Sequence, residues 1–240
     1  MGCGHSRQSL AKDKKVITDL SQVKLEDLSR ASRFEMQIPI SLTDVEVYCK
    51  AIRDIHPKKK TLTPAELISG MSYLNSWSKV PADGIFHKIL AECTLLRDEE
   101  SGELSKNALL LWGIVLAGGK SLVKVKAFYD ILQDSEQERI SATDKDFPGN
   151  FMLMINLTTT MVNEWEAKYS SQEPEKSDEY ISKIDKLREK LAEEAFLDPV
   201  FGNSSNLLRA EWETQVLSQV QWIFDSNHVR KFVDEWVAKQ

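Results

Sequence analysis

The sequence predicts an all-α protein in which helix–loop–helix units repeat and additional helices follow. Two observations predict this class. Apolar residues recur at helical spacing along most of the chain, most regularly at Val229, Phe232, Val233, Trp236 and Val237. A short phrase that begins a helix also recurs four times at intervals of about 40 residues, an interval typical of a repeated supersecondary unit.

Each copy of the phrase has an aliphatic residue, then Ser or Thr, then the first turn of a predicted helix. The hydroxyl accepts a hydrogen bond from a free amide of that turn, and an acid three residues later lies near the positive end of the helix. Four unrelated helix caps are the alternative interpretation. The copies are Leu62-Thr63, Leu104-Ser105, Ile140-Ser141 and Ile181-Ser182, with acids at Glu66, Asp144 and Asp185.

The phrases divide the chain into four segments. These are a leader (1–15), an N-terminal helix with the first pair of units (16–120), the second pair (121–197) and a C-terminal helical extension (198–240).

Apolar spacing further predicts where single helices run and where they break. Uninterrupted helices are expected over 63–78, 151–168 and 182–196. Pro148-Gly149 and the stretch from Pro199 to Asn206 are expected to be breaks, because proline and glycine interrupt regular structure.

The leader carries a lipidation pattern. Its start, Met-Gly-Cys-Gly-His-Ser, has Gly2 where N-myristoylation occurs and a serine at the favoured position. Cys3 is expected to take a palmitoyl group, since one acyl chain holds a bilayer only marginally and a second makes the attachment stable. Basic residues follow and would attract anionic lipid. The alternative is a polar leader with an unmodified glycine.

Composition excludes several classes of function. The net charge of −6 argues against nucleic-acid binding. The three cysteines lie far apart with no zinc spacing, and neither a secretory signal nor a membrane-spanning run is visible. No catalytic constellation or cofactor motif stands out, so we expect no enzyme activity. The expected location is cytoplasmic, peripheral on the cytosolic face of a membrane through the lipid anchor.

The repeat resembles the EF-hand. Aligned in this way, Leu62, Leu104, Ile140 and Ile181 take the eighth loop position, where an aliphatic residue pairs two loops in a small sheet. The layout is similar to N-myristoylated neuronal calcium sensors, to calcineurin B-like proteins and to the EF-hand-like N-terminal half of TLDc-domain proteins. The resemblance implies two pairs of units that present a hydrophobic groove to an amphipathic helix of a protein partner.

The loops depart from the calcium-binding pattern, which needs oxygen ligands at positions one, three and five, glycine at six and a bidentate acid at twelve. The first loop has Lys59 and Lys60 inside it, and the second has Arg97 at position one and Ala108 at position twelve. We therefore predict no useful calcium affinity. The weak candidates for a metal, in a shifted register of the third loop, are Asp134, Glu136, Asp144 and Asp146.

The preferred hypothesis is a non-enzymatic, membrane-anchored adaptor that binds a protein partner. One alternative is a calcium sensor with a single working loop over 133–144. Another is an all-helical scaffold unrelated to EF-hands, whose last helices use Trp212, Trp222 and Trp236 in an interface. Paired strands at Leu62 and Leu104 would favour the EF-hand interpretation over the scaffold.

Overall fold

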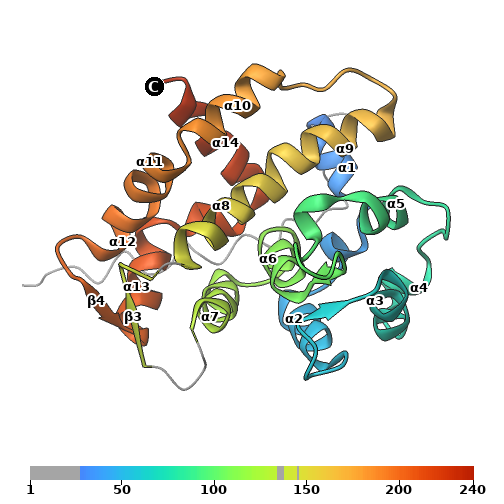
Figure 1. The fold of residues 1–240 in the computed structure, drawn as a ribbon, viewed down its shortest axis with the longest axis horizontal. Coiled ribbons are helices and arrows are strands. Elements are labelled where there is room, and N and C mark those ends of the chain that lie inside the picture. The colour runs from blue at the N-terminus through green and yellow to red at the C-terminus, as the bar shows by residue number, and fades with distance from the viewer. Residues whose placement is uncertain (1–27, 134–137, 145) are drawn as a thin grey trace, which may run out of the picture.

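The computed structural model of the chain describes residues 28–133, 138–144 and 146–240 (Figure 1). Most of these residues are helical, and the strands among them form two short pairs, which confirms the all-α class. The first helices are α1 (Arg30–Glu35), α2 (Val45–Asp54), α3 (Pro64–Met71), α4 (Asn75–Ser78), α5 (Ile85–Glu92) and α6 (Lys106–Leu116), with 3-10 turns η3 (Pro39–Leu42) and η4 (Thr94–Leu96).

The second half of the chain is also helical. Its helices are α7 (Ser121–Leu132), α8 (Asp146–Thr158), α9 (Thr160–Ser170), α10 (Asp178–Lys186), α11 (Arg188–Ala192), α12 (Asp198–Phe201), α13 (Arg209–Gln219) and α14 (Ser226–Val237), with a π-helical turn η5 (Glu193–Leu197) and a 3-10 turn η6 (Gln221–Phe224).

The two strand pairs join loops that are distant in sequence. Strand β1 (Thr61–Leu62) pairs antiparallel with β2 (Leu104–Ser105), and Leu62 lies directly opposite Leu104. This is the pairing that the first two phrases predict, and both leucines are fully buried. Strand β3 (Arg139–Ser141) pairs antiparallel with β4 (Asn206–Leu208), which places Ile140 opposite Leu207.

The predicted fourth unit is therefore wrong. Ile181 and Ser182 lie inside α10, which Ser177 already caps by accepting a hydrogen bond from the Tyr180 amide at 3.2 Å. Ile140 instead pairs with Leu207, well beyond the expected position. The helices from α8 to α12 therefore lie between β3 and β4 in the sequence, and the spacing of the paired loops is less regular than the four phrases suggest.

Two of the predicted single helices are interrupted. Helix α3 ends at Met71, before α4 begins. The long helix expected over 151–168 is divided at Thr159, where the hydroxyls of Thr158 and Thr159 donate to the carbonyls of Met154 and Ile155 at 3.0 and 2.8 Å. Hydroxyls that bond one turn back compete with the backbone and bend a helix.

The third expected helix and the two expected breaks also differ from the structure. The stretch 182–196 spans the end of α10, all of α11 and most of η5. Pro148 lies in the first turn of α8, where a missing N–H leaves no helical bond unmade, so the helix begins before it. Pro199 likewise lies in the first turn of α12, and the turn begins at Gly202.

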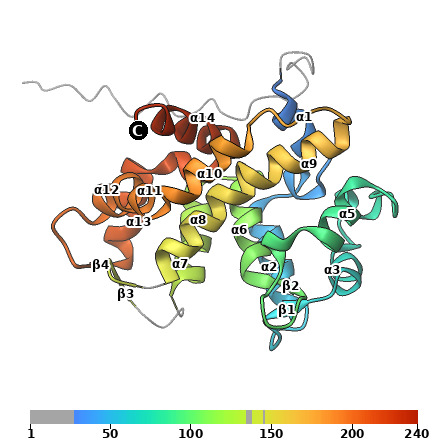
Figure 2. The same cartoon turned by 45° about the horizontal axis from the view of Figure 1, so that its top comes forward.

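Helix α6 lies at the centre of the fold, packed against α2, α7 and α8 (Figure 2). Residues 108–115 of α6 are all buried. Gly113 permits the closest approach, because a Cβ there would lie 2.1 Å from the Tyr48 ring of α2. The Tyr48 hydroxyl also donates to the Leu109 carbonyl at 3.0 Å. Helix α2 is therefore fixed against α6 by shape and by a buried hydrogen bond.

The C-terminal helices cover the second half of the molecule. Helix α13 packs on α7, and α14 packs on α8. Phe128 of α7 lies within 6.2 Å, between ring centroids, of Trp212 on α13 and Phe224 on η6. Trp212 is fully buried. The apolar faces of α7 and α8 are thus packed against helices of the same chain.

The close contact at Gly113 generates a first prediction. Gly113→Ala should lower the free energy of unfolding by about 1–3 kcal/mol, because the added methyl group displaces the Tyr48 ring. Gly149→Ala in α8 is the matched control, since its Cβ meets no atom within 4 Å. It should raise stability by roughly 0.5–1 kcal/mol through the helical preference of alanine. Urea unfolding measures both, and equal stability of G113A and the natural protein would contradict the packing argument.

Candidate functional site

The first loop, residues 55–66, is closed by its own cations. The Lys59 ammonium lies 2.6 Å from Oε1 of Glu66, and His56 Nε2 lies 3.3 Å from the same oxygen. The other oxygen accepts from the Thr63 amide at 2.9 Å, which completes the predicted capping box. The hydrogen bond from Lys59 and the amide of Thr63 lower the pKa of Glu66 to about 2. Both oxygens of the acid at position twelve are thus engaged.

A second cation reaches this loop from the other unit of the pair. Lys106 is the first residue of α6, and its side chain crosses to the beginning of the first loop. Its ammonium donates to the carbonyl oxygens of Ile55 and His56, the latter at 3.0 Å. Lys106 is only 8 % exposed, and burial lowers the pKa of its ammonium. The carbonyl oxygens at the start of the loop are therefore bound to a protein side chain.

The second loop is closed by Arg97, which stands at its first position. The guanidinium donates to the carbonyls of Leu90, at 2.9 Å, and of Ala91 at the end of α5, and to the carbonyl of Gly102 within the loop. Gly102 adopts φ +68°, the left-handed conformation that favours glycine. An arginine thus occupies the position from which a calcium loop would offer its first oxygen.

Two carboxylates of the second loop, Asp98 and Glu103, are bound to other groups of the chain. Asp98 accepts from the backbone and hydroxyl of Ser101, both at 2.9 Å, and the amide lowers its pKa. Glu103 accepts from the Thr61 hydroxyl of the first loop at 2.7 Å and so adds a side-chain link beside the strand pair.

The third loop holds one of the weak metal candidates in an internal hydrogen bond. Gln133 Nε2 donates to Asp144 at 2.6 Å, and the other carboxylate oxygen accepts from the Asp146 amide at 3.0 Å. Asp146 itself is exposed in the first turn of α8. The candidates Asp134 and Glu136 lie outside the described residues.

The second strand pair has a basic residue at the place that corresponds to Lys106. Arg209 follows Leu207 by two residues, as Lys106 follows Leu104. Its amide donates to the Glu138 carbonyl at 2.8 Å, just as the Lys106 amide donates to the Lys60 carbonyl at 3.0 Å. The Arg209 guanidinium forms ion pairs with Asp130 and Glu213, both at 2.9 Å. The two basic residues hold equivalent positions, with their amides bonded across the strand pair, and each side chain reaches an earlier element, the first loop for Lys106 and α7 for Arg209.

Sequence reasoning missed the role of these two residues. A signal existed, because a basic residue in the first turn of a helix faces the positive end of the helix dipole and needs another partner.

The structure does not test the other predicted site residues together. Gly2 and Cys3 lie outside the described residues. The predicted fourth loop, residues 170–179, is described, and it forms neither of the two strand pairs. Asp185, the acid of the fourth phrase, lies on α10, and Lys176, just before that helix, pairs with Asp234 at 2.7 Å. Over 28–133, 138–144 and 146–240, no cluster of three His, Cys, Asp or Glu residues is placed to hold a metal. Within the same ranges, no helix is both long and apolar enough to span a bilayer.

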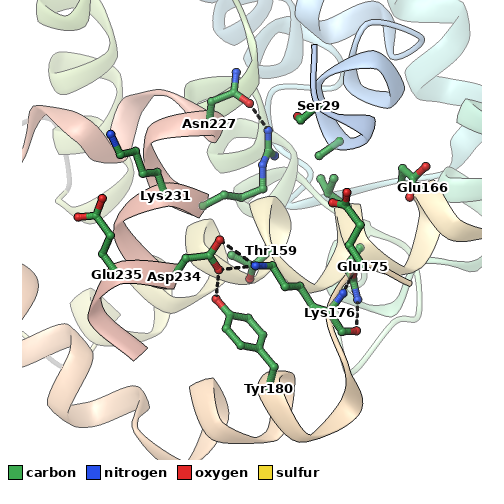
Figure 3. Close-up of a pocket in the computed structure, with 14 residues that line it drawn as sticks. Ser29, Thr159, Glu166, Glu175, Lys176, Tyr180, Asn227, Lys231, Asp234 and Glu235 are labelled. Atoms are coloured by element: carbon green, nitrogen blue, oxygen red, sulfur yellow. Dashed lines mark hydrogen bonds and ion pairs between the residues drawn. The ribbon is translucent and has the colours of Figure 1, made fainter. Parts of the chain in front are cut away.

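A separate pocket of about 390 Å³ lies between α1, α9, α10 and α14 (Figure 3). Asp234 of α14 accepts two hydrogen bonds from Lys176, at 2.7 and 2.8 Å, and one from the Tyr180 hydroxyl. Asn163 of α9 holds the Lys176 backbone through both its donor and its acceptor, at 3.0 and 2.8 Å. These polar groups bind one another and so fix the loop before α10 against α14.

Two further ion pairs beside this pocket fix α1, the first described helix. Arg30 donates to both oxygens of Glu166 on α9, at 3.0 and 2.6 Å. Glu35 accepts from Arg230 of α14 at 2.6 and 3.0 Å, and from the Ser226 hydroxyl at 2.9 Å. Both carboxylates are buried. We name this pair of contacts the α1 clamp. The pocket is thus chiefly a junction between helices.

Comparison of the chain with protein families, with curated proteins and with solved structures gives no match.

The Glu66 pairing predicts a pH dependence. A carboxylate whose pKa falls from 4.5 to about 2 on folding adds stability above pH 4.5, and this contribution is lost as the pH falls toward 2. Glu66→Gln keeps a side chain that can cap the helix but removes the charge. In thermal unfolding at a series of pH values, the natural protein should melt at a higher temperature than E66Q at pH 6. The difference in melting temperature should vanish near pH 2. Glu99→Gln, on the exposed second loop, controls for the change in net charge. A difference that is constant with pH would contradict the ion pair.

The α1 clamp predicts a large cost when one partner is removed. Arg230→Met leaves the Glu35 carboxylate, whose side chain is 7 % exposed, without its cation, and should cost about 3–5 kcal/mol. The double variant Glu35→Met, Arg230→Met should recover part of that loss, because no buried charge remains. Lys190→Met breaks an exposed ion pair with Glu194 and should change stability by less than about 1 kcal/mol. Guanidinium unfolding measures all three. Equal losses of unfolding free energy in R230M and K190M would contradict the α1 clamp.

Proposed function

We propose that the chain is a non-enzymatic adaptor, held on the cytosolic face of a membrane by acyl groups on Gly2 and Cys3. Its body derives from EF-hand units that no longer use calcium. The observation that carries the proposal is the occupation of the first loop pair by protein cations. Lys59 and Lys106 are bound to the oxygens at the two ends of the first loop. A body of this kind holds its conformation without a metal, as a constitutive adaptor requires.

Three features support EF-hand ancestry for the first pair. Leu62 and Leu104 are directly opposed, as the eighth positions of two paired loops would be. Gly102 has a positive φ at the sixth position of the second loop. Glu66 stands at position twelve in a complete capping box. The second pair supports the same ancestry less directly, since its fourth strand follows an insertion of helices.

The partner surface is proposed on the first unit, because the C-terminal helices cover the second half. An open pocket of about 770 Å³ lies between α2 and α3. Ala51, Ile55 and Gly70 give it an apolar part, and Tyr73 at its edge is 66 % exposed. An amphipathic helix of a partner protein suits an apolar depression with a polar rim, which Asp54, His56 and Glu66 provide here.

The membrane anchor is tested by fractionation of cells that express the full chain. Gly2→Ala removes the acceptor of the myristoyl group and should move the protein from the membrane to the soluble fraction. Cys3→Ser should leave only partial membrane attachment, because the myristoyl chain that remains binds only marginally on its own. Gly4→Ala, which keeps the lipidation pattern, is the matched control and should behave as the natural protein does. An unchanged distribution of G2A would remove the anchor from the proposal.

A further inference from the structure

The first loop binds side-chain ammonium groups where the EF-hand alignment expects a divalent ion. Ile55 stands at position one and Glu66 at position twelve, the two ends of a calcium loop. The Ile55 carbonyl accepts from Lys106, and the Glu66 carboxylate accepts from Lys59 at 2.6 Å. Oxygen atoms at both ends of the loop are therefore bound by ammonium groups of the same chain.

An ammonium group needs fewer oxygen partners than a calcium ion does. Calcium takes six to eight oxygens, including a bidentate carboxylate, and the first loop offers isoleucine, proline and lysine at positions one, three and five, where side-chain oxygens are needed. An ammonium has three donors and is satisfied by two or three oxygens. Lys106 finds two of them in the carbonyls of Ile55 and His56. The loop thus suits an ammonium and does not fit the metal.

Lys106 also joins two units that a metal ion would not join. Its backbone belongs to α6 in the second unit, whereas its ammonium lies on the first loop, which follows α2. The same residue donates its amide to Lys60, beside the strand pair. The ionic contact therefore strengthens the junction that β1 and β2 form.

We propose that the Lys106 ammonium is the structural cation of the first loop, and that it fixes the strand-paired conformation without a metal. Arg209 has the equivalent role in the second pair, where its guanidinium binds Asp130 at the end of α7. This inference rests on the EF-hand ancestry in the proposed function. It is independent of the membrane anchor and of the partner, so the fractionation of G2A tests neither residue.

The first test separates the contribution of the Lys106 ammonium from that of its alkyl chain. Lys106→Met keeps most of the alkyl chain but lacks the ammonium, and leaves two carbonyl oxygens without a donor. It should lower the melting temperature of the full chain by roughly 5 °C. Lys126→Met, at an exposed position of α7, is the matched control and should change it by less than about 1 °C. A K106M protein as stable as K126M, or more stable, would overturn the proposal, because desolvation would then outweigh the contact.

Chemical rescue separates a cation site from ordinary packing. Lys106→Ala leaves a space that propylammonium can fill with the missing atoms and charge. Propylammonium chloride should raise the melting temperature of K106A more than that of the natural protein, and more than 1-propanol does at the same concentration. Equal effects of propylammonium and propanol would overturn the proposal, since packing alone would explain them. If K106A does not fold, the comparison of K106M with K126M decides.

Calcium provides the last comparison. The natural protein should melt at the same temperature in millimolar calcium chloride and in EDTA at matched ionic strength. A calcium-dependent increase that disappears in E66Q would place a metal in the first loop and overturn the proposal.

Discussion

Helix α6 is apolar on almost all of its surface, and such a helix is stable only where other elements cover it on every side. Helices from both halves of the chain do so, with α2 on one side and α7 and α8 on others. The absence of a side chain at Gly113 allows the Tyr48 ring of α2 to reach the backbone of α6. The packing of α2 on α6 brings the loop after α2 beside the start of α6, where β1 and β2 pair.

Buried lysines in this protein are satisfied by backbone carbonyls. An ammonium loses its hydration on burial, and oxygen partners must replace the lost water. Lys106 finds them in the first loop, and Lys124 of α7 donates to the Phe224 carbonyl of η6 at 2.7 Å. Burial lowers the pKa of Lys124 to about 8. In each case the carbonyl belongs to another element, so a charged side chain ties two parts of the fold.

Local signals in the sequence predicted local structure well. Thr63 and Ser105 cap the helices that follow them, and Leu62 pairs with Leu104 because loop spacing and apolar character fix that register. The pairing of β3 with β4 was not predicted, because Leu208, the N-cap of α13, has no hydroxyl, and Glu211 caps the helix by accepting from the Leu208 amide at 2.9 Å. The division of the long helix at Thr159 depends on hydroxyls that bond backward, which apolar spacing does not reveal.

The contacts that set the candidate site were harder to predict, since they join residues far apart in sequence. Lys106 and Ile55 are neighbours only after α2 and α6 have packed. The same holds for the α1 clamp, in which Glu35 and Arg230 are separated by 195 positions. At the usual rate of synthesis of roughly 5–20 residues per second, the ribosome needs roughly 10–40 s to travel from one to the other. During that interval the carboxylate of Glu35 has no Arg230 to bind, so α1 gains this half of its attachment only when translation of the chain is nearly complete.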